Sequence, residues 1–234
     1  MNKRHSFGQH FLISNSVAKS IVDSAKLTKN DIVLEVGTGE GVLIPFLCKQ
    51  AKKVISIEKD RLLYSQAKEK FSTLPNLILE QGDVFKMNFD FTVLVSNLQY
   101  SESRNAIEWL VQRKFSHAII MVQKEFAEKL LVKEGSDRRS VGVLANYCMK
   151  IDKLSDVNKN NFKPTPKVNS VVIRLDQKQQ VTREMVKTIN NLFSFKRKTI
   201  RHIAKKYGIT IDSDKRLEDL EDGEIIEIAQ KIIR

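Results

Sequence analysis

The chain has 234 residues, 41% of them hydrophobic, and carries a net charge of +12 at pH 7. This length and composition fit one sizeable core with room for a small second unit, and the charge favours a polyanionic partner. No apolar run in the sequence is long enough to cross a bilayer, which excludes a membrane-spanning protein. The Cys and His residues lack the spacing of metal ligands, so no metal site is predicted.

Two cysteines, Cys48 and Cys148, lie in apolar segments of helical character. We expect both to be reduced core residues rather than a disulfide, which is typical of a cytoplasmic protein. The first ten residues are basic and polar, so they do not resemble a signal peptide.

From Asp31 onward, short apolar runs alternate with amphipathic segments of helical period. This alternation predicts an α/β fold with a doubly wound, mostly parallel, Rossmann-like sheet. A first helix begins after the capping residues 14–16, and the stretch 141–149 fits either a helix or a strand. Strands are predicted over 32–36, 54–57, 77–79, 93–95, 118–122 and 171–175, and helices over 41–50, 61–71, 103–113 and 124–132.

The polar stretch 176–180 separates this pattern from a C-terminal part that is purely helical, with helices predicted over 181–195, 199–207 and 224–233. We therefore predict a sheet domain over 1–177 and a small helical domain over 178–234. Acids gather over 212–227, so that end is expected to face away from a polyanion.

Three glycines, Gly37, Gly39 and Gly41, follow the first predicted strand and open a helix. Glycine lets the backbone turn tightly and approach a ligand closely. The spacing differs from that of dinucleotide-binding turns, and Glu40 would repel a pyrophosphate. S-adenosyl-L-methionine carries a sulfonium cation and no phosphate, so this turn suits it. The alternative is a tight strand-to-helix turn without a ligand.

Two acids follow the next two strands. Glu58 ends the second strand, where a carboxylate can accept hydrogen bonds from ribose hydroxyls, and Asp83 follows the third, where it can accept from an adenine amino group. Alone, Glu58 fits an acid at a helix start and the Gly82-Asp83 pair a turn. Because ligands bind at the carboxyl ends of parallel strands, the joint spacing predicts a nucleoside site.

The fourth strand is followed by Asn97, Leu98, Gln99 and Tyr100. The Asn97 side-chain oxygen and the Leu98 carbonyl can accept both hydrogens of an exocyclic amine, and Tyr100 can stack on its base. Together with the glycine turn and the acids, this corner predicts a methyltransferase that uses S-adenosyl-L-methionine.

The sequence resembles the ribosomal RNA adenine N6,N6-dimethyltransferases, which include the small-subunit dimethyladenosine transferases and the erythromycin-resistance methylases. The resemblance covers roughly the whole chain. It rests on the motifs at 8–12, 35–39, 57–60, 82–83, 97–100, 123–126, 162–170 and 195–201.

This resemblance implies roles for individual residues. Tyr100 and Phe162 would stack on the two faces of a flipped adenine, with the alternative for Phe162 being a loop-packing staple. His10 would contact the cofactor, with the alternative being a capping residue of the first helix. Cofactor contacts are implied for His10, Leu12, Gly37, Gly39, Glu58, Asp83 and Asn97, and a catalytic corner for Asn97, Leu98, Tyr100 and Phe162.

Two departures from the family pattern stand out. Gln99 occupies a position where proline is usual, so the constraint that proline places on Leu98 must come from packing instead. The segment 138–142 reads Arg-Arg-Ser-Val-Gly, where relatives more often have Gly-Arg-Leu-Ser, which puts a local RNA contact in doubt.

Basic residues in the C-terminal part form a run without acids, and phosphate contact with an A-form RNA helix is the favoured interpretation over a solvated helix face. The predicted RNA-binding residues are Lys163, Lys167, Lys196, Arg197, Lys198 and Arg201.

The resemblance thus implies a monomeric enzyme that dimethylates two adjacent adenosines in a hairpin of small-subunit rRNA, within the ribosomal precursor. Alternatives are a ribosome-assembly or RNA-binding factor with weak or lost methyl transfer, a large-subunit rRNA methylase and a DNA adenine methylase. An NAD dehydrogenase fits least, because of the glycine spacing and the Asn97 corner.

Overall fold

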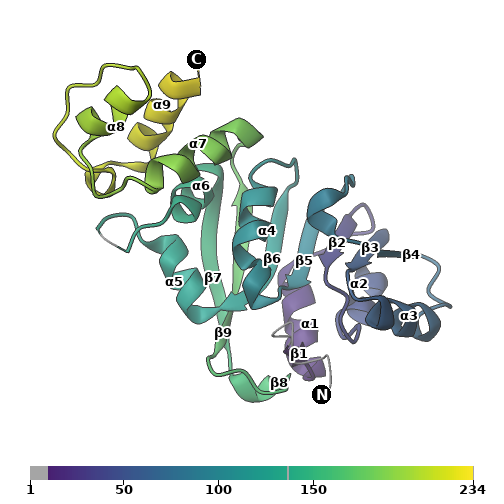
Figure 1. Ribbon diagram of the computed structural model, residues 1–234. Coiled ribbons are helices and arrows are strands. Elements are labelled where there is room, and N and C mark those ends of the chain that lie inside the picture. Colours follow the sequence, from purple (N-terminus) through teal and green to yellow (C-terminus); the bar gives the residue numbers. More distant parts are fainter. Residues whose placement is uncertain (1–9, 136, 234) are drawn as a thin grey trace. The chain divides into compact units, whose positions relative to one another are not determined.

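The computed structural model describes residues 10–135 and 137–233 (Figure 1). The chain divides into two compact units. The first takes the described residues up to Ala106 with Lys114–Lys124 and Asp152–Asp176, and the second takes Ile107–Arg113, Glu125–Ile151 and the described residues from Gln177. The boundary predicted between a sheet domain over 1–177 and a helical domain over 178–234 stays a prediction.

A seven-stranded sheet forms the framework of the chain, in the order β4-β3-β2-β5-β6-β9-β7. The first five strands in this order are parallel and β9 is antiparallel to β6, so the predicted α/β, mostly parallel sheet is confirmed. The strands are β2 (Ile32–Val36), β3 (Lys53–Glu58), β4 (Leu77–Gln81), β5 (Val93–Asn97), β6 (His117–Gln123), β7 (Met149–Val157) and β9 (Ser170–Gln177).

Helices follow the parallel strands, as the alternation of patterns predicted. The Ser14 hydroxyl accepts from the Val17 N–H and caps α1, and the Asp60 carboxylate caps α3 through the Leu62 and Leu63 N–H groups. These caps fix where two of the helices begin. α1 (Asn15–Ser24) precedes β2, and the helices that follow the parallel strands are α2 (Ile44–Gln50), α3 (Arg61–Lys70) and α4 (Ser103–Leu110), with short 3-10 turns η2 (Val84–Lys86) and η3 (Tyr100–Glu102).

The core of the first unit lies between the strands and these helices. Val33, Val54 and Val93 come from neighbouring strands and are fully buried, and they pack with Ile21 of α1 and Leu47 of α2. Strands buried on both faces read as continuous apolar runs, which explains why these strands were predictable from the sequence.

A second, two-stranded sheet joins distant parts of the chain. β1 (Phe11–Leu12) pairs antiparallel with β8 (Phe162–Lys163), and Figure 1 shows the two strands side by side. This pairing holds the described start of the chain against the segment that precedes β9. The Gly8 and Gln9 positions of the first motif lie outside the described residues.

The second unit is helical. Its helices are α5 (Lys124–Leu131), α6 (Ser140–Cys148), α7 (Arg183–Phe193), α8 (Ile200–Lys206) and α9 (Asp222–Ile233), with the short turn η5 (Leu217–Asp219). The ambiguous stretch 141–149 is helix α6 and the first residue of β7. The remainder of β7 was not predicted, because most of its residues are exposed and form no apolar run.

Arg138 is a buried cation in the second unit, with 1% of its surface exposed. Its guanidinium donates to the carbonyls of Leu217 and Leu220 and pairs with the Asp222 carboxylate. Arg138 therefore fastens the start of α6 to the segment that leads into α9. This unusual residue of the 138–142 segment has a packing role and is not available to RNA.

Cys48 and Cys148 are buried and free, as predicted. Burial raises the pKa of the Cys48 thiol to about 11 and that of Cys148 to about 12, so both stay protonated. No helix in the described part of the chain is long and apolar enough to span a bilayer.

Candidate functional site

The carboxyl ends of β4, β3, β2 and β5 lie at one edge of the sheet, because these neighbouring strands are parallel and in register. Glu58 and Asn97 are the last residues of β3 and β5, and Asp83 follows β4. The glycine turn follows β2. The structure therefore brings together the four segments that the sequence placed at a common edge.

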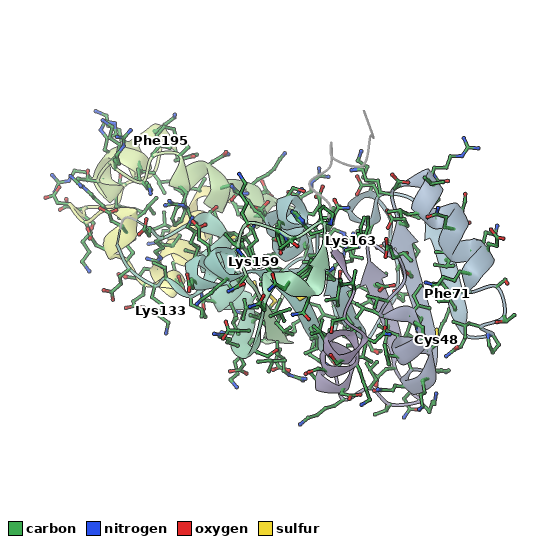
Figure 2. The ribbon with its side chains drawn as sticks, turned by 90° about the horizontal axis from the view of Figure 1, so that it is seen from below. Cys48, Phe71, Lys133, Lys159, Lys163 and Phe195 are labelled. Atoms are coloured by element: carbon green, nitrogen blue, oxygen red, sulfur yellow. The ribbon has the colours of Figure 1, made fainter. Side chains whose placement is uncertain are left out.

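The glycine turn adopts backbone conformations that favour glycine. The φ angles of Gly37, Gly39 and Gly41 are 81°, 56° and 76°, in the left-handed region. A Cβ on Gly41 would lie 2.2 Å from the Phe71 ring, and Figure 2 labels Phe71. Gly41 is thus required by packing, whereas a Cβ on Gly37 would meet nothing within 4 Å and its backbone faces open space.

Glu58 fastens this turn to the end of β3. Its carboxylate is 2% exposed and accepts from the Gly39 N–H at 2.9 Å and from the Asp60 N–H at 2.8 Å. A carboxylate has about four lone-pair sites, so two remain for hydroxyl donors of a ligand. The same acid that shapes the turn can therefore also bind a ribose.

A second buried acid, Glu35, lies beside it in a hydroxyl network. The Ser56 hydroxyl donates to the Glu35 carboxyl at 2.5 Å, and the hydroxyls of Thr38 and Ser56 are 2.6 Å apart. Burial, opposed by the Ser56 hydrogen bond and reinforced by the nearby Glu58 charge, raises the pKa of Glu35 to about 8. Glu35 is therefore mostly protonated at neutral pH.

Two compartments open at this edge, one of about 50 Å³ and one of about 720 Å³. Both are lined by Gly37, Glu58, Leu98 and Gln99, so they meet there. The small compartment is also lined by His10, Leu12, Gly39 and Asn97, and the large one by Asp83. All the residues predicted to contact a cofactor thus line one continuous site within the first unit.

Asp83 forms the far wall of the large compartment. Its carboxylate accepts from the Phe85 N–H at 3.2 Å and lies 3.7 Å from the Lys59 ammonium and 3.9 Å from that of Lys86. Val84 and Phe85 line the compartment beside it. An acid next to apolar side chains suits a planar base that carries an amino group.

His10 lies over the small compartment. Its Nδ1 is 2.7 Å from the Pro164 carbonyl oxygen, and its ring centroid is 5.6 Å from that of Tyr100. The alternative interpretation of His10 as a helix cap does not hold, because Ser14 caps α1.

Phe162 is a buried residue of the small β1–β8 sheet. It is 2% exposed and belongs to the hydrophobic core with Leu12, which pairs with it across β1 and β8. In this structure its ring is a packing group, as the staple interpretation proposes, because β1 covers it. A role for Phe162 in base stacking stays a prediction.

The comparisons with known proteins identify the family of this chain. The family model of ribosomal RNA adenine dimethylase matches residues 1–232. The chain belongs to this family. Ribosomal RNA small subunit methyltransferase A of Thermotoga maritima is 33% identical over 237 residues, which cover 98% of this chain and 85% of that protein.

Solved structures of similar fold include a dimethyladenosine transferase from Plasmodium falciparum. It matches with a TM-score of 0.79 and 27% identity, over 96% of this chain and 98% of that one. The 23S rRNA methyltransferase ErmE matches with a TM-score of 0.67 and 20% identity, over 96% of this chain and 100% of that one, which shows a shared fold. The resemblance and the Rossmann-like methyltransferase fold predicted from the sequence are confirmed.

Gln99, which departs from the dimethylase family pattern, keeps a proline-like backbone. Its φ of −58° lies within the range that a proline ring imposes, and its ψ is 135°. The Leu98 N–H donates to the Met121 carbonyl at 3.2 Å, and the Gln99 carbonyl accepts from the Glu102 N–H at 2.9 Å. Packing and hydrogen bonds thus supply the constraint, since Leu98 is 2% exposed.

The predicted RNA-binding residues of this dimethylase-family chain lie in two places. Lys163 of β8, which Figure 2 labels, and Lys167 of the loop between β8 and β9 are exposed in the first unit. Lys196, Arg197 and Lys198 form the turn between α7 and α8 of the second unit, rather than a helix face. Their contact with RNA stays a prediction.

Arg201 on α8 has partners that the sequence did not indicate. Its guanidinium lies 2.6 Å from the Asp212 carboxylate and 3.4 Å from that of Asp214. Asp212 and Asp214 therefore lie beside a residue that is predicted to bind RNA, and the expectation that the acidic end faces away from a polyanion stays a prediction. The loop that carries them is held against α8 by the Ile200 N–H, which donates to the Lys215 carbonyl.

Proposed function

We propose that the chain transfers methyl groups from S-adenosyl-L-methionine to N6 of two adjacent adenosines in a hairpin of small-subunit rRNA. The observation that carries this proposal is the position of Asn97, which ends β5 and lines the same compartment as the glycine turn and Glu58. A hydrogen-bond acceptor for an amine thus lies where a methyl donor would end.

The residues present fit the cofactor. Gly37 leaves the backbone of the turn open, Glu58 retains acceptor sites for ribose hydroxyls, and Asp83 lies beside an apolar wall for adenine. The acids that line the small compartment suit a cationic group and disfavour a phosphate. When bound, S-adenosyl-L-methionine supplies an electrophilic methyl group on a sulfonium.

Asn97 and Leu98 prepare the target amine. The adenine N6 is a weak nucleophile because its lone pair is delocalised into the ring. Two acceptors, the Asn97 side-chain oxygen and the Leu98 carbonyl, direct its two hydrogens and stabilise the positive charge that develops on nitrogen. Positioning and electrostatics of this kind supply most of the rate in such sites. A strong general base is not needed, since the methylated ammonium is very acidic.

Tyr100 would receive the base, which must leave its stack to reach Asn97. The ring follows Asn97 by three positions, and it begins the turn η3. Dimethylation takes two rounds, so the corner must also accept a monomethylated amine. We further propose that the protein acts as a cytoplasmic monomer.

A methylation assay tests the proposal. Tritiated S-adenosyl-L-methionine is incubated with the protein and under-methylated small subunits, and the modified bases are mapped. We expect two labelled adenosines in one hairpin of the small-subunit rRNA. Binding of the particles without label would favour an assembly factor, and preferential labelling of naked large-subunit rRNA would favour a large-subunit methylase. Either result would overturn the proposal.

Replacing Lys196, Arg197 and Lys198 together by alanine is expected to weaken RNA binding and its dependence on salt. Each phosphate contact adds about 0.7 to 0.9 to the slope of log K against log salt concentration, so the slope should fall by about two. Binding is measured by fluorescence anisotropy of a labelled rRNA hairpin at several salt concentrations.

The matched control removes the same charge elsewhere. Lys49, Lys52 and Lys68 are exposed, and they lie near the ends of α2 and α3 or just before β3, toward the edge of the sheet opposite the site. Their triple alanine variant is expected to keep the wild-type slope. An unchanged slope in the first variant, or an equal change in both, would contradict the assigned RNA contact.

A further inference from the structure

Tyr100 is held at its hydroxyl end. The Tyr100 hydroxyl lies 2.7 Å from the Ser170 hydroxyl, although the two residues are 70 positions apart in the sequence. The Tyr100 side chain is half-buried and Ser170 is fully buried. A buried hydroxyl requires a partner, and in this structure the partner of Ser170 is the tyrosine.

Ser170 offers a rigid anchor. It is the first residue of β9, where it lies opposite Gln123 of β6 in the antiparallel ladder. Its neighbour Asn169 accepts from the Lys124 N–H at 3.1 Å. The backbone on both sides of the serine is thus fixed by the sheet, so the hydroxyl that meets Tyr100 has little freedom to move.

The ring of Tyr100 is confined on one side as well. The His10 ring lies 5.6 Å away, centroid to centroid, at an angle of 34°. His10 is itself tied to the Pro164 carbonyl. A tyrosine side chain has two rotatable bonds, and a contact at the hydroxyl together with a neighbour at the ring removes most of its freedom.

We propose that Ser170 is a positioning residue that sets the orientation of the Tyr100 ring for the target base. This inference rests on the proposed function. The amine of the base is directed by Asn97 and Leu98, so the plane of the base is set there, and the Tyr100 ring must match that plane to stack on it. Ser170 orients the Tyr100 ring in that plane through their hydroxyl contact, and it does not touch the base.

Ser170 is also separate from the cofactor site. Neither Ser170 nor Tyr100 lines the two compartments of the cofactor site, and the Ser170 hydroxyl contacts the Tyr100 hydroxyl. Loss of its hydroxyl should therefore lower kcat and leave the affinity for S-adenosyl-L-methionine unchanged. A merely structural role would instead affect both, together with the thermal stability.

A double-mutant cycle tests the proposal. We expect Ser170→Ala and Tyr100→Phe each to lower kcat about three- to tenfold, the equivalent of one hydrogen bond, with KM for the cofactor unchanged. The double variant should lose no more than either single variant. Thermal unfolding and circular dichroism establish that each variant is folded, and Tyr100→Phe, which keeps the ring, tests the bond if Ser170→Ala does not fold.

Ser96→Ala is the matched control. Ser96 is a fully buried serine of β5, and its hydroxyl donates to the Val36 carbonyl at 2.6 Å. Any effect of this change should be the same with Tyr100 or phenylalanine at position 100. The proposal is overturned if Ser170→Ala retains wild-type kcat. It is also overturned if the fall in kcat of the double variant equals the combined falls of Ser170→Ala and Tyr100→Phe, as is expected for the Ser96→Ala control. A wild-type protein without methyl transfer would instead refute the proposed function.

Discussion

The Asn97→Ala variant is expected to lose methyl transfer by about a hundredfold or more, while its affinity for S-adenosyl-L-methionine changes by less than about threefold. Removal of one preorganised group that stabilises developing charge costs about 10² to 10³ in kcat. Asn97 supplies one of the two acceptors for the amine, whereas cofactor binding is shared with Glu58, Asp83 and the glycine turn. The variant therefore separates chemistry from binding.

Single-turnover transfer of a tritiated methyl group and isothermal titration calorimetry measure the two quantities. Asn30→Ala serves as the control, because Asn30 is an exposed asparagine in the loop before β2, at the opposite edge of the sheet. We expect this control to match the wild type in both measurements. Wild-type turnover in Asn97→Ala would refute the role of the side chain, and loss of cofactor binding equal to the loss of turnover would make Asn97 a binding residue only.

The parts of the fold that were predictable are those whose local pattern agrees with their final burial. β2, β3 and β5 are buried on both faces and appear in the sequence as apolar runs. β7 was missed because its residues from Lys153 to Asp156 are exposed. Since β7 is the last strand in the sheet order, its polar sequence follows from its position at an edge, which only the tertiary structure reveals.

The site was predictable where it depends on order along the chain. Parallel strands bring their carboxyl ends together, so the glycine turn, Glu58, Asp83 and Asn97 could be grouped from spacing alone. The packing of Phe162 under β1 could not be predicted, because it requires the pairing of segments about 150 residues apart, Phe11 with Lys163. The Ser170 partner of Tyr100, 70 positions away, depends on a long-range contact in the same way.

The hydroxyl network around Glu35 is a further contact of this kind, and the burial of Glu35 within it makes the stability of the protein depend on pH. The pKa of Glu35 is raised from 4.5 to about 8, chiefly by burial. Between these values the folded protein binds a proton that the unfolded chain does not. The free energy of unfolding contributed by this proton is therefore fully present below about pH 4.5, and it is lost as the pH rises through about 8.

Glu35→Gln is expected to remove this dependence. The amide is uncharged at every pH, and its oxygen can still accept from the Ser56 hydroxyl, so the network is kept without the cost of a buried charge. One pKa unit corresponds to about 1.4 kcal/mol; the stability of the variant relative to the wild type should therefore rise by about 4 kcal/mol between pH 5 and pH 8.5. Urea unfolding at several pH values measures this difference.

Glu69→Gln is the control for this experiment, because Glu69 is an exposed glutamate on α3. We expect its free energy of unfolding, plotted against pH, to run parallel to that of the wild type. A Glu35→Gln curve that also ran parallel would show that Glu35 titrates in the folded protein as it does in the unfolded chain. Glu35 would then be charged before any cofactor binds. The Ser56 and Thr38 hydroxyls would stabilise an anion rather than a neutral carboxyl group.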